Sequence, residues 1–293
     1  MIDRLLITGA AGEIATALRH NLDDLAKAVR LSDLRAVENL GANEEYVAAD
    51  LTRADEVARM VDGVDAIVHL GGIPRESTWD RILPANIVGL YNVFEAARVA
   101  GVSRIIFASS NHTIGFHPVT ERVDAETPVR PDGIYAVSKV FGEALGRLYA
   151  DKYAMSVACL RIGAFRRKPQ IARHLTAWAS PADIVRLVRA CLTRDFHFIT
   201  VYGVSANSRR MWFDDSEALL GFVPRDNAEA YASELPAPDD PDGIGHLFHG
   251  GDVCAGGFVG GADRMLGTPA ESATGKSAAP RAGDGQEKEP PRD

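Results

Sequence analysis

The sequence contains few cysteines and no pattern of metal ligands. Only three cysteines occur among 293 residues, at positions 159, 191 and 254, and none belongs to a CxxC pair. This spacing excludes a disulfide framework and a zinc ribbon, and it is typical of a protein that works in a reducing cytosol. The eight histidines show no metal-ligand spacing either. We therefore expect no metal centre.

Long basic stretches and long apolar runs are missing as well. The formal net charge of -8 argues against nucleic acid as the main partner. No apolar run approaches the ~20 residues that a membrane span needs, and the N-terminal stretch MIDRLLITGAAG lacks the apolar core of a signal peptide. These absences predict a cytoplasmic protein with neither a nucleic acid nor a membrane as its partner.

What the sequence does contain is a regular alternation of strand-like apolar runs and helix-like patterns. Short apolar runs rich in β-formers occur at 4–8, 28–32, 66–70, 104–109 and 156–161, and helical patterns occupy 12–22, 54–62, 80–100, 133–153 and 181–193. Strands alternating with helices at this spacing predict an α/β fold, a Rossmann-type doubly wound parallel sheet with helices on both faces.

The alternation decays after about residue 200. Residues 201–235 have the pattern of one strand and two short helices, which predicts a small C-terminal substrate-binding cap. We expect one dehydrogenase-like domain over 1–261, with cap elements mostly after residue 160. From 262 to 293 Gly, Pro, Ala, Ser and charged residues dominate, and too little apolar surface remains to offset chain entropy, so a disordered tail is predicted.

A glycine-rich turn near the N-terminus predicts a dinucleotide site. Gly9 and Gly12 lie between the first strand and the first helix, with the spacing G-x-x-G-x-x-A that ends at Ala15. Small residues there let backbone N–H groups approach a pyrophosphate. Asp33, at the end of the second strand, stands where a carboxylate binds the adenosine ribose. An ordinary turn and a capping Asp are the alternatives, but the combination favours NAD.

Two later strand ends add candidate cofactor contacts. Asp50, in AADLT, is expected near the adenine, with a capping role for the next helix as the alternative. The stretch HLGGI, residues 69–73, is expected to pass the ribose and phosphate closely, unless its glycines serve only the turn. The candidate cofactor contacts are Gly9, Gly12, Glu13, Ile14, Asp33, Leu34, Asp50, Leu51, Leu70, Gly71, Gly72, Lys139 and Phe165.

A tyrosine and a lysine four residues apart are the candidate catalytic groups. Tyr135 and Lys139 share one face of the predicted helix 133–153, and Ser110 follows the fifth strand, 25 residues before Tyr135. A free Tyr has a pKa of about 10, which a nearby ammonium and a positive nicotinamide would lower. Ser110 is expected to hydrogen-bond the reacting oxygen. The alternative is a half-buried Tyr and a solvated Lys, since Y-x-x-x-K often occurs by chance.

Together these stretches resemble the extended short-chain dehydrogenase/reductase superfamily and, more narrowly, the bacterial uronate dehydrogenases. The resemblance covers roughly residues 3–260 and is carried by TGAAG, HLGGI, NIVGLYN, FASSNHTIGF, RPDGIYAVSK, RIGAF and DNAEAY. It implies that Tyr135 is the base and that Lys139 binds the nicotinamide ribose. It also implies a homo-oligomer.

The same resemblance implies a set of substrate contacts. These are Pro74, Ser110, Asn111, His112, Ala164 and Arg173, of which Arg173 would bind the sugar carboxylate. Pro74 and Ala164 stand where the family has serines, which leaves the exact sugar open. The implied reaction is NAD-dependent oxidation of a hexuronic acid, galacturonate or glucuronate, at C1 to the aldarolactone.

Other functions remain open from the sequence. A basic stretch runs from Arg161 through Arg166, Arg167 and Lys168 to Arg173 without an acid, and it predicts either a solvated loop or capture of an anionic substrate. An aldose or sugar-phosphate 1-dehydrogenase would use the same chemistry. A nucleotide-sugar epimerase or dehydratase is less favoured, because the region after residue 160 is short. A non-catalytic dinucleotide sensor is disfavoured by the catalytic residues.

Overall fold

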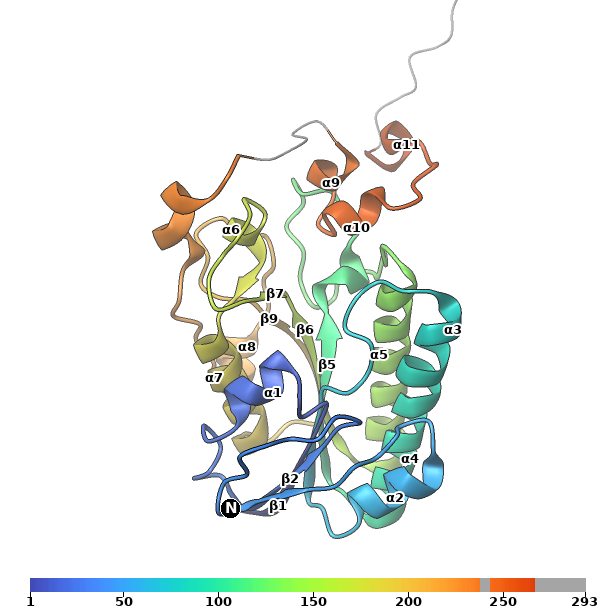
Figure 1. The fold of residues 1–293 in the computed structure, drawn as a ribbon. Coiled ribbons are helices and arrows are strands. Elements are labelled where there is room, and N and C mark those ends of the chain that lie inside the picture. The colour runs from blue at the N-terminus through green and yellow to red at the C-terminus, as the bar shows by residue number, and fades with distance from the viewer. Residues whose placement is uncertain (238–242, 267–293) are drawn as a thin grey trace, which may run out of the picture. The chain divides into compact units, whose positions relative to one another are not determined.

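Seven strands form one parallel sheet in the computed structural model, which describes residues 1–237 and 243–266. Its order is β3-β2-β1-β4-β5-β6-β9, and every neighbouring pair is parallel (Figure 1). The strands are β1 Ile2–Thr8, β2 Ala26–Ser32, β3 Glu44–Tyr46, β4 Ala66–His69, β5 Arg104–Ser110, β6 Ser156–Ile162 and β9 Phe198–Gly203. The predicted doubly wound sheet is confirmed. Its order places a change of direction between β1 and β4, where such sheets bind their ligands.

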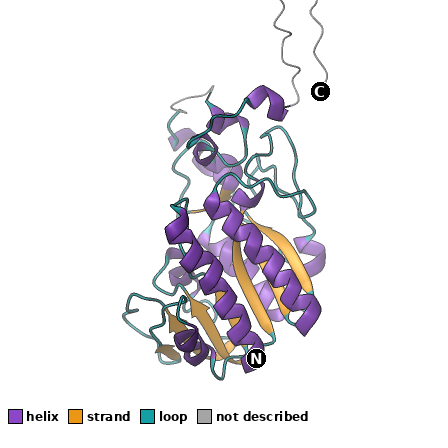
Figure 2. Cartoon of the chain, turned by 90° about the vertical axis from the view of Figure 1, so that its right-hand side faces the viewer, coloured by secondary structure: helices purple, strands orange, loops and turns teal. Residues whose placement is uncertain are grey.

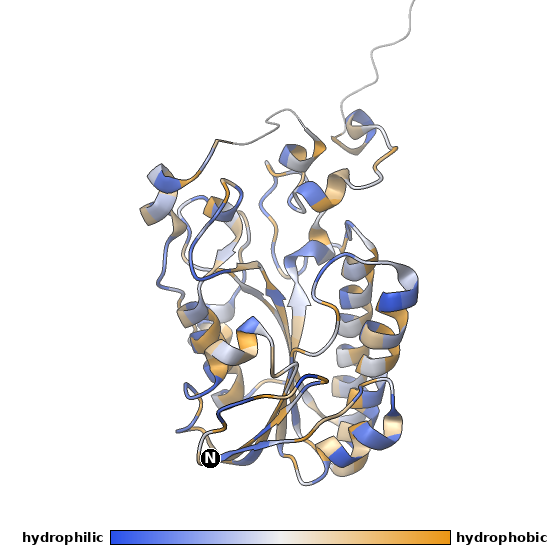
Figure 3. Ribbon diagram, viewed as in Figure 1, coloured by the Kyte–Doolittle hydropathy of each residue, from blue (hydrophilic) through white to orange (hydrophobic). Residues whose placement is uncertain are grey.

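Helices cover both faces of this sheet. Helices α1 (Glu13–Leu18) and α7 (Pro181–Thr193) lie on one face, and α2 (Ala54–Val61), α4 (Gly89–Ala100) and α5 (Ile134–Tyr153) lie on the other (Figures 1 and 2). Each face has its own apolar core, one packed under α1 and α7 and one under α2, α4 and α5. Hydrophobic and hydrophilic residues alternate around these helices, as expected for helices that are half buried (Figure 3).

Two predicted helices differ from the structure. The pattern over 80–100 is divided into α3 (Trp79–Ile82), a π-helical segment η1 (Leu83–Val88) and α4. Pro84 explains the interruption, because proline lacks the N–H that a regular helix needs. The predicted helix 12–22 ends at Leu18, and His20 adopts a φ of 62°.

The cap elements follow β6 and β9. A short parallel pair, β7 (Ala164–Phe165) and β8 (Trp178–Ala179), flanks α6 (His174–Ala177). After β9 come α8 (Ser216–Leu220), the 3-10 helix η3 (Ala228–Glu234), α9 (Ile244–Leu247) and α10 (Asp252–Ala255). Residues 247–250 pair with 115–119 through main-chain hydrogen bonds.

Met1–Phe258 forms one compact unit, and a second unit begins at Val259. The second unit contains α11 (Ala262–Leu266), so the predicted tail begins within a helix, and residues 267–293 lie outside the described residues. The boundary at 261 and the disorder of the tail stay predictions. Within the described ranges, none of the helices combines the length and hydropathy that a bilayer crossing requires.

Candidate active site

The glycine-rich turn after β1 leaves room for a cofactor backbone. Gly9 has a φ of +67°, and a Cβ there would lie 2.7 Å from the carbonyl carbon of Leu70. A Cβ on Gly12 would lie 3.0 Å from the oxygen of Gly9. A side chain at either position would fill the turn, so both glycines fit the close approach of a pyrophosphate.

Asp33 faces this turn from the end of β2. Its Oδ2 accepts a hydrogen bond from the N–H of Ala11 at 3.1 Å, and its Oδ1 accepts one from the N–H of Arg35 at 2.9 Å. The carboxylate is thereby fixed at the rim of the glycine turn, where an adenosine ribose would present its hydroxyls. The exposed guanidinium of Arg35 lies 3.8 Å from Asp33 and donates to the carbonyl of Ala11 at 3.0 Å.

The loop after β4 lies against this glycine turn and is the opposite wall of the candidate cofactor site. A Cβ on Gly71 would lie 2.8 Å from Cδ1 of Leu51, so these two predicted contacts are neighbours. The N–H of Gly71 donates to Oγ1 of Thr8 at 3.1 Å, and the same oxygen lies 2.8 Å from Nδ1 of His69. Burial lowers the pKa of His69 to about 3, so its imidazole is neutral and anchors this loop.

The remaining predicted cofactor contacts are less distinctive. The carboxylate of Asp50 accepts hydrogen bonds from the N–H and hydroxyl of Thr52, at 2.9 and 2.8 Å, within the turn before α2. The alternative that Asp50 caps this helix is wrong, because the N-cap residue is Arg53 and no side chain caps it. Leu34 and Glu13 are exposed, while Ile14 is partly buried against the core. Gly72, at φ +126°, packs against Asn86. Phe165 lies in β7, and its contact with a cofactor stays a prediction.

The three predicted catalytic residues come together at the carboxyl end of β5. Tyr135 and Lys139 lie one turn apart on α5, and the Nζ of Lys139 is 5.5 Å from the centroid of the Tyr135 ring. Nζ donates a hydrogen bond to the carbonyl of Ala108 at 2.7 Å. Burial lowers the pKa of Lys139 to about 8. Lys139 is therefore a buried group beside the phenol, and the alternative of a solvated Lys is excluded.

Burial raises the pKa of Tyr135 to about 12, a hydrogen bond with Ser110 lowers it, and the charge of Asp132 raises it. The protein alone therefore keeps the phenol protonated at neutral pH. A positive charge beside the ring, such as that of an oxidised nicotinamide, would shift the equilibrium toward phenolate.

The N-terminus of α5 is held by a residue that the sequence did not reveal. The carboxylate of Glu76, in the loop after β4, accepts from the N–H groups of Ile134 at 3.1 Å and Tyr135 at 3.0 Å. A Cβ on Gly133 would lie 2.1 Å from a Glu76 oxygen, so the glycine makes room for this cap. The loop that borders the cofactor site thus fixes the backbone of the candidate base. Gly133, at the N-cap position, has no capping side chain of its own, and this was the available signal.

The predicted substrate contacts surround the same residues. Asn111 and His112 begin the 3-10 helix η2 (Asn111–Ile114), and the N–H of His112 donates to Oγ of Ser110 at 3.2 Å. The Nδ2 of Asn111 is buried and has no hydrogen-bond partner in the described part of the chain. The ring centroids of His112 and Tyr135 are 6.2 Å apart. Pro74 is exposed in the loop after β4, and Ala164 lies in β7.

Arg173 lies at the N-cap position of α6, and its side chain is half-buried beneath the C-terminal cap. Its Nη2 donates to the carbonyl of His249 at 2.5 Å, and a Cβ on Gly251 would lie 2.5 Å from its Nε. No carboxylate of the described residues forms an ion pair with it. The guanidinium thus keeps donors for an anion from outside the chain.

The basic stretch 161–173 is not one anion-binding loop. Arg161 is buried and forms a bidentate pair with Glu143, with Nη2 at 2.9 Å and Nε at 3.0 Å from its oxygens, so it is a structural strand-end residue. Arg166 lies 3.9 Å from Glu13, and Nζ of Lys168 lies 5.3 Å from the centroid of the Tyr231 ring. Only part of the stretch is therefore free for a ligand.

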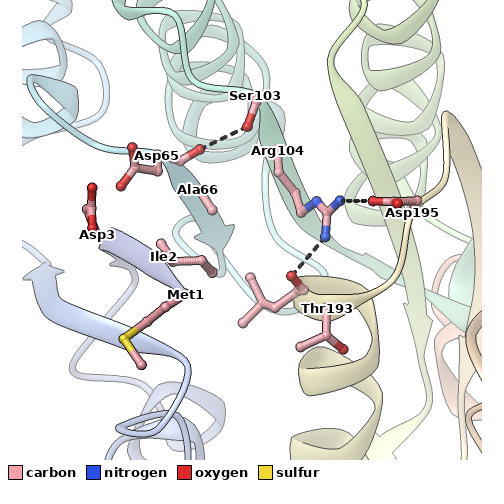
Figure 4. Close-up of a pocket in the computed structure, with 10 residues that line it drawn as sticks. Met1, Ile2, Asp3, Asp65, Ala66, Ser103, Arg104, Thr193 and Asp195 are labelled. Atoms are coloured by element: carbon pink, nitrogen blue, oxygen red, sulfur yellow. Dashed lines mark hydrogen bonds and ion pairs between the residues drawn. The ribbon is translucent and has the colours of Figure 1, made fainter.

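A cavity of about 380 Å³ lies at the opposite, amino-terminal edge of the sheet (Figure 4). It is lined by the first residues of β1, β4 and β5 and by the end of α7. Arg104 donates there to the carbonyl of Leu192 at 2.8 Å and lies 3.7 Å from Asp195. It is far along the strands from Tyr135 and belongs to no predicted site. Among the described residues, no group of three or more His, Cys, Asp or Glu could hold a metal ion.

Comparison with known proteins gives a consistent result. The family described as "NAD dependent epimerase/dehydratase family" matches residues 5–199. A uronate dehydrogenase of Agrobacterium fabrum (strain C58) is 46% identical over 252 residues, which cover 85% of this chain and 95% of that relative. An NAD-dependent glucose-6-phosphate dehydrogenase of Haloferax volcanii is 35% identical, and the match covers 78% of this chain and 96% of that relative.

Solved structures agree with these relatives. The crystal structure of uronate dehydrogenase from Agrobacterium tumefaciens is 45% identical, has a TM-score of 0.83, and the match covers 86% of this chain and 97% of that chain. A Tyr-to-Ala mutant of that enzyme, complexed with NAD, is 44% identical, with the same TM-score of 0.83 and the same coverage of 86% and 97%.

Proposed function

Because this chain belongs to the NAD-dependent epimerase/dehydratase family and is an NAD-dependent oxidoreductase similar to the uronate dehydrogenases, we propose that it oxidises a hexuronic acid at C1. The substrate class is galacturonate or glucuronate, and the product is the aldarolactone. The observation that carries the substrate class is Arg173, a half-buried guanidinium that forms no ion pair among the described residues, although burial lowers its pKa and the charges of Asp132 and Asp252 raise it. A planar guanidinium suits a carboxylate, which it can bind through two parallel hydrogen bonds.

The reaction follows from the groups around α5. NAD supplies the hydride acceptor when it is bound. The phenolate of Tyr135 takes the proton of the C1 hydroxyl, and the hydroxyl of Ser110 holds the same oxygen in place. The Nζ of Lys139 lies 5.5 Å from the centroid of the Tyr135 ring. While Lys139 is protonated, its positive charge stabilises the phenolate. Glu76 fixes the start of α5 and so the position of Tyr135.

The predicted cofactor site fits this chemistry. Gly9 and Gly12 leave the space for a pyrophosphate, and the fixed carboxylate of Asp33 suits two ribose hydroxyls. The same carboxylate would repel a 2′-phosphate, which favours NAD over NADP. Asn111 and His112 are the proposed contacts to sugar hydroxyls.

A second candidate function is oxidation of a neutral aldose or a sugar phosphate at C1. Two observations favour keeping it. Pro74 and Ala164 offer no hydroxyl to a sugar, and relatives named as a glucose-6-phosphate dehydrogenase and an L-arabinose 1-dehydrogenase are 35% and 33% identical. Arg166, Arg167 and Lys168 would then hold the phosphate.

A screen for NADH formation separates these candidates. The wild-type protein is incubated with NAD and galacturonate, glucuronate, galactose, glucose or glucose 6-phosphate, and absorbance is followed at the NADH band. We expect the two uronates to give the highest kcat/KM. A kcat/KM for glucose 6-phosphate or a neutral aldose that exceeds both uronates would refute the uronate assignment and leave the hydride chemistry intact.

We also propose that the protein acts as a homo-oligomer in the cytoplasm. Apolar side chains lie exposed on α4 and α5, among them Tyr91 at 49%, Val99 at 71%, Val137 at 43% and Leu148 at 50%, and a second copy would cover them. The cysteines are all free and buried, which suits a reducing compartment. Light scattering should give a molar mass at least twice that of one chain. A variant with both Val137→Glu and Leu148→Glu should be monomeric. A monomeric wild type would refute the oligomer.

A further inference from the structure

A buried carboxylate lies directly behind one of the proposed sugar contacts. The side chain of Asp132 has 0% exposure, while that of His112 has 20%. The Oδ2 of Asp132 lies 2.6 Å from Nδ1 of His112. A carboxylate accepts hydrogen bonds but does not donate them, so Nδ1 of His112 carries the proton. In the neutral imidazole, Nε2 is then an acceptor.

Two glycines from different parts of the chain make room for this carboxylate. A Cβ on Gly115, which follows η2, would lie 2.0 Å from Oδ2 of Asp132. A Cβ on Gly250, in the cap, would lie 1.9 Å from the same atom. The N–H of Gly250 donates to the carbonyl of Gly115 at 2.8 Å, so the two segments enclose Asp132 together. A side chain on either glycine would occupy the position of this carboxylate.

This arrangement has two evident costs. The Oδ1 of Asp132 is buried and has no hydrogen-bond partner in the described part of the chain, and an unsatisfied buried acceptor is destabilising. The charge of Asp132 also raises the pKa of Tyr135, which opposes the formation of phenolate. The charge of Asp132 is favourable to the guanidinium of Arg173, whose pKa burial lowers and this charge raises. The shortest hydrogen bond of Asp132, however, leads to His112, which points to a role in the sugar site.

We propose that Asp132 is a positioning residue of the sugar site, which holds His112 in the Nδ1–H tautomer and keeps Nε2 as the acceptor for a sugar hydroxyl. The inference rests on the proposed function, because it takes His112 to contact the substrate. The geometry supports it, since the His112 and Tyr135 rings are neighbours at 6.2 Å. A sugar whose C1 hydroxyl meets Tyr135 would therefore have further hydroxyls close to His112.

The first test reads the tautomer directly. The full chain with bound NAD is labelled with ¹⁵N in its imidazoles, and the two ring nitrogens of His112 are assigned by NMR. We expect Nδ1–H in the wild type, and a shift toward the Nε2–H tautomer in Asp132→Asn and Asp132→Ala. The alanine variant removes the acceptor whichever way the Asn amide turns. An unchanged Nδ1–H tautomer in Asp132→Ala would overturn the proposal.

The second test is kinetic and has a matched control. We expect Asp132→Asn to lower kcat/KM for the uronate about 10- to 150-fold, mainly through KM, with the affinity for NAD unchanged. The control is Cys254→Ala, which removes the long hydrogen bond that Sγ donates to Oδ2 of Asp132 at 4.0 Å but keeps the carboxylate and its short hydrogen bond to His112. It should stay within about threefold of wild type.

A double variant separates positioning from a general structural effect. In a His112→Ala background, Asp132→Asn should lower kcat/KM for the uronate by less than about a further twofold, because the residue through which Asp132 acts is gone. A full additional loss would refute the proposal. The outcomes also remain separate from the proposed function. If the tautomer follows Asp132 but the uronates are not oxidised, the substrate assignment fails and the positioning role stands.

Discussion

Replacing Arg173 by alanine tests the substrate class most directly. In the structure the guanidinium donates one hydrogen bond to the carbonyl of His249 and forms no ion pair with a carboxylate of the described residues. A hydrogen bond to a charged group contributes about 1.5–3 kcal/mol, and a bidentate pair with a carboxylate about 2–5 kcal/mol. The variant should therefore lose about 30- to several-thousand-fold in kcat/KM for a uronate.

The loss should depend on the substrate's carboxylate. Galacturonate and galactose differ at C6, where one has a carboxylate and the other a hydroxymethyl group, so their ratio of kcat/KM reports on the Arg173 contact. We expect this ratio to collapse in Arg173→Ala, while the affinity for NAD is unchanged. Arg173→Lys should recover only part of it, because an ammonium cannot make the planar two-bond contact.

A separate cost to stability must be measured alongside. Without Arg173 the carbonyl of His249 loses its partner, which is expected to lower the free energy of unfolding by about 1–3 kcal/mol. Thermal melts of the variant give its Tm, and the kinetics must be measured well below that temperature so that the enzyme is folded. The matched control is Arg166→Ala, an exposed arginine of the same cap, which should stay within about threefold of wild type. If Arg166→Ala is damaging and Arg173→Ala is not, the uronate assignment is refuted and the sugar-phosphate alternative is favoured.

Three further predictions concern the base, the cofactor and the effect of pH. Tyr135→Phe should keep the affinity for NAD but lower kcat about 10²–10⁴-fold, and a variant with more than about a tenth of wild-type turnover would exclude Tyr135 as the base. Asp33→Ser should relax the preference for NAD over NADP, with Arg35 then free to meet a 2′-phosphate; equal use of both cofactors by the wild type would contradict the role of Asp33. His69 has a folded-state pKa lowered to about 3, so the unfolded chain binds its proton first as the pH falls below 6.5, and stability drops by up to about 1.4 kcal/mol per pH unit from this residue. Urea unfolding between pH 4 and 7 should show that slope, and His69→Gln should flatten it; an unchanged slope in the variant would show that other groups cause the acid sensitivity.

The sequence alone determined those features that depend on neighbours along the chain. The alternation of strand-like and helix-like segments predicted the parallel sheet, because each pattern depends only on residues close together in the sequence. The glycine turn of Gly9 and Gly12 was visible for the same reason. Tyr135 and Lys139 were recognised because a helix brings residues four apart to one face. One strand and two short helices were also predicted over 201–235, and the structure has β9, α8 and η3 there, with the strand beginning at Phe198.

The tertiary structure decided which distant residues complete the site. Glu76 caps the helix of Tyr135 from 59 residues away, and Arg173 reaches a carbonyl 76 residues further on. It also assigned Arg161 to a buried pair with Glu143 instead of a ligand site. Asp132 lies within a stretch that the sequence already singled out, yet its link to His112, 20 residues earlier, required the fold. Loops at the carboxyl edge of a sheet meet through the order of its strands, and this order is set by packing of the whole chain, which no local pattern contains.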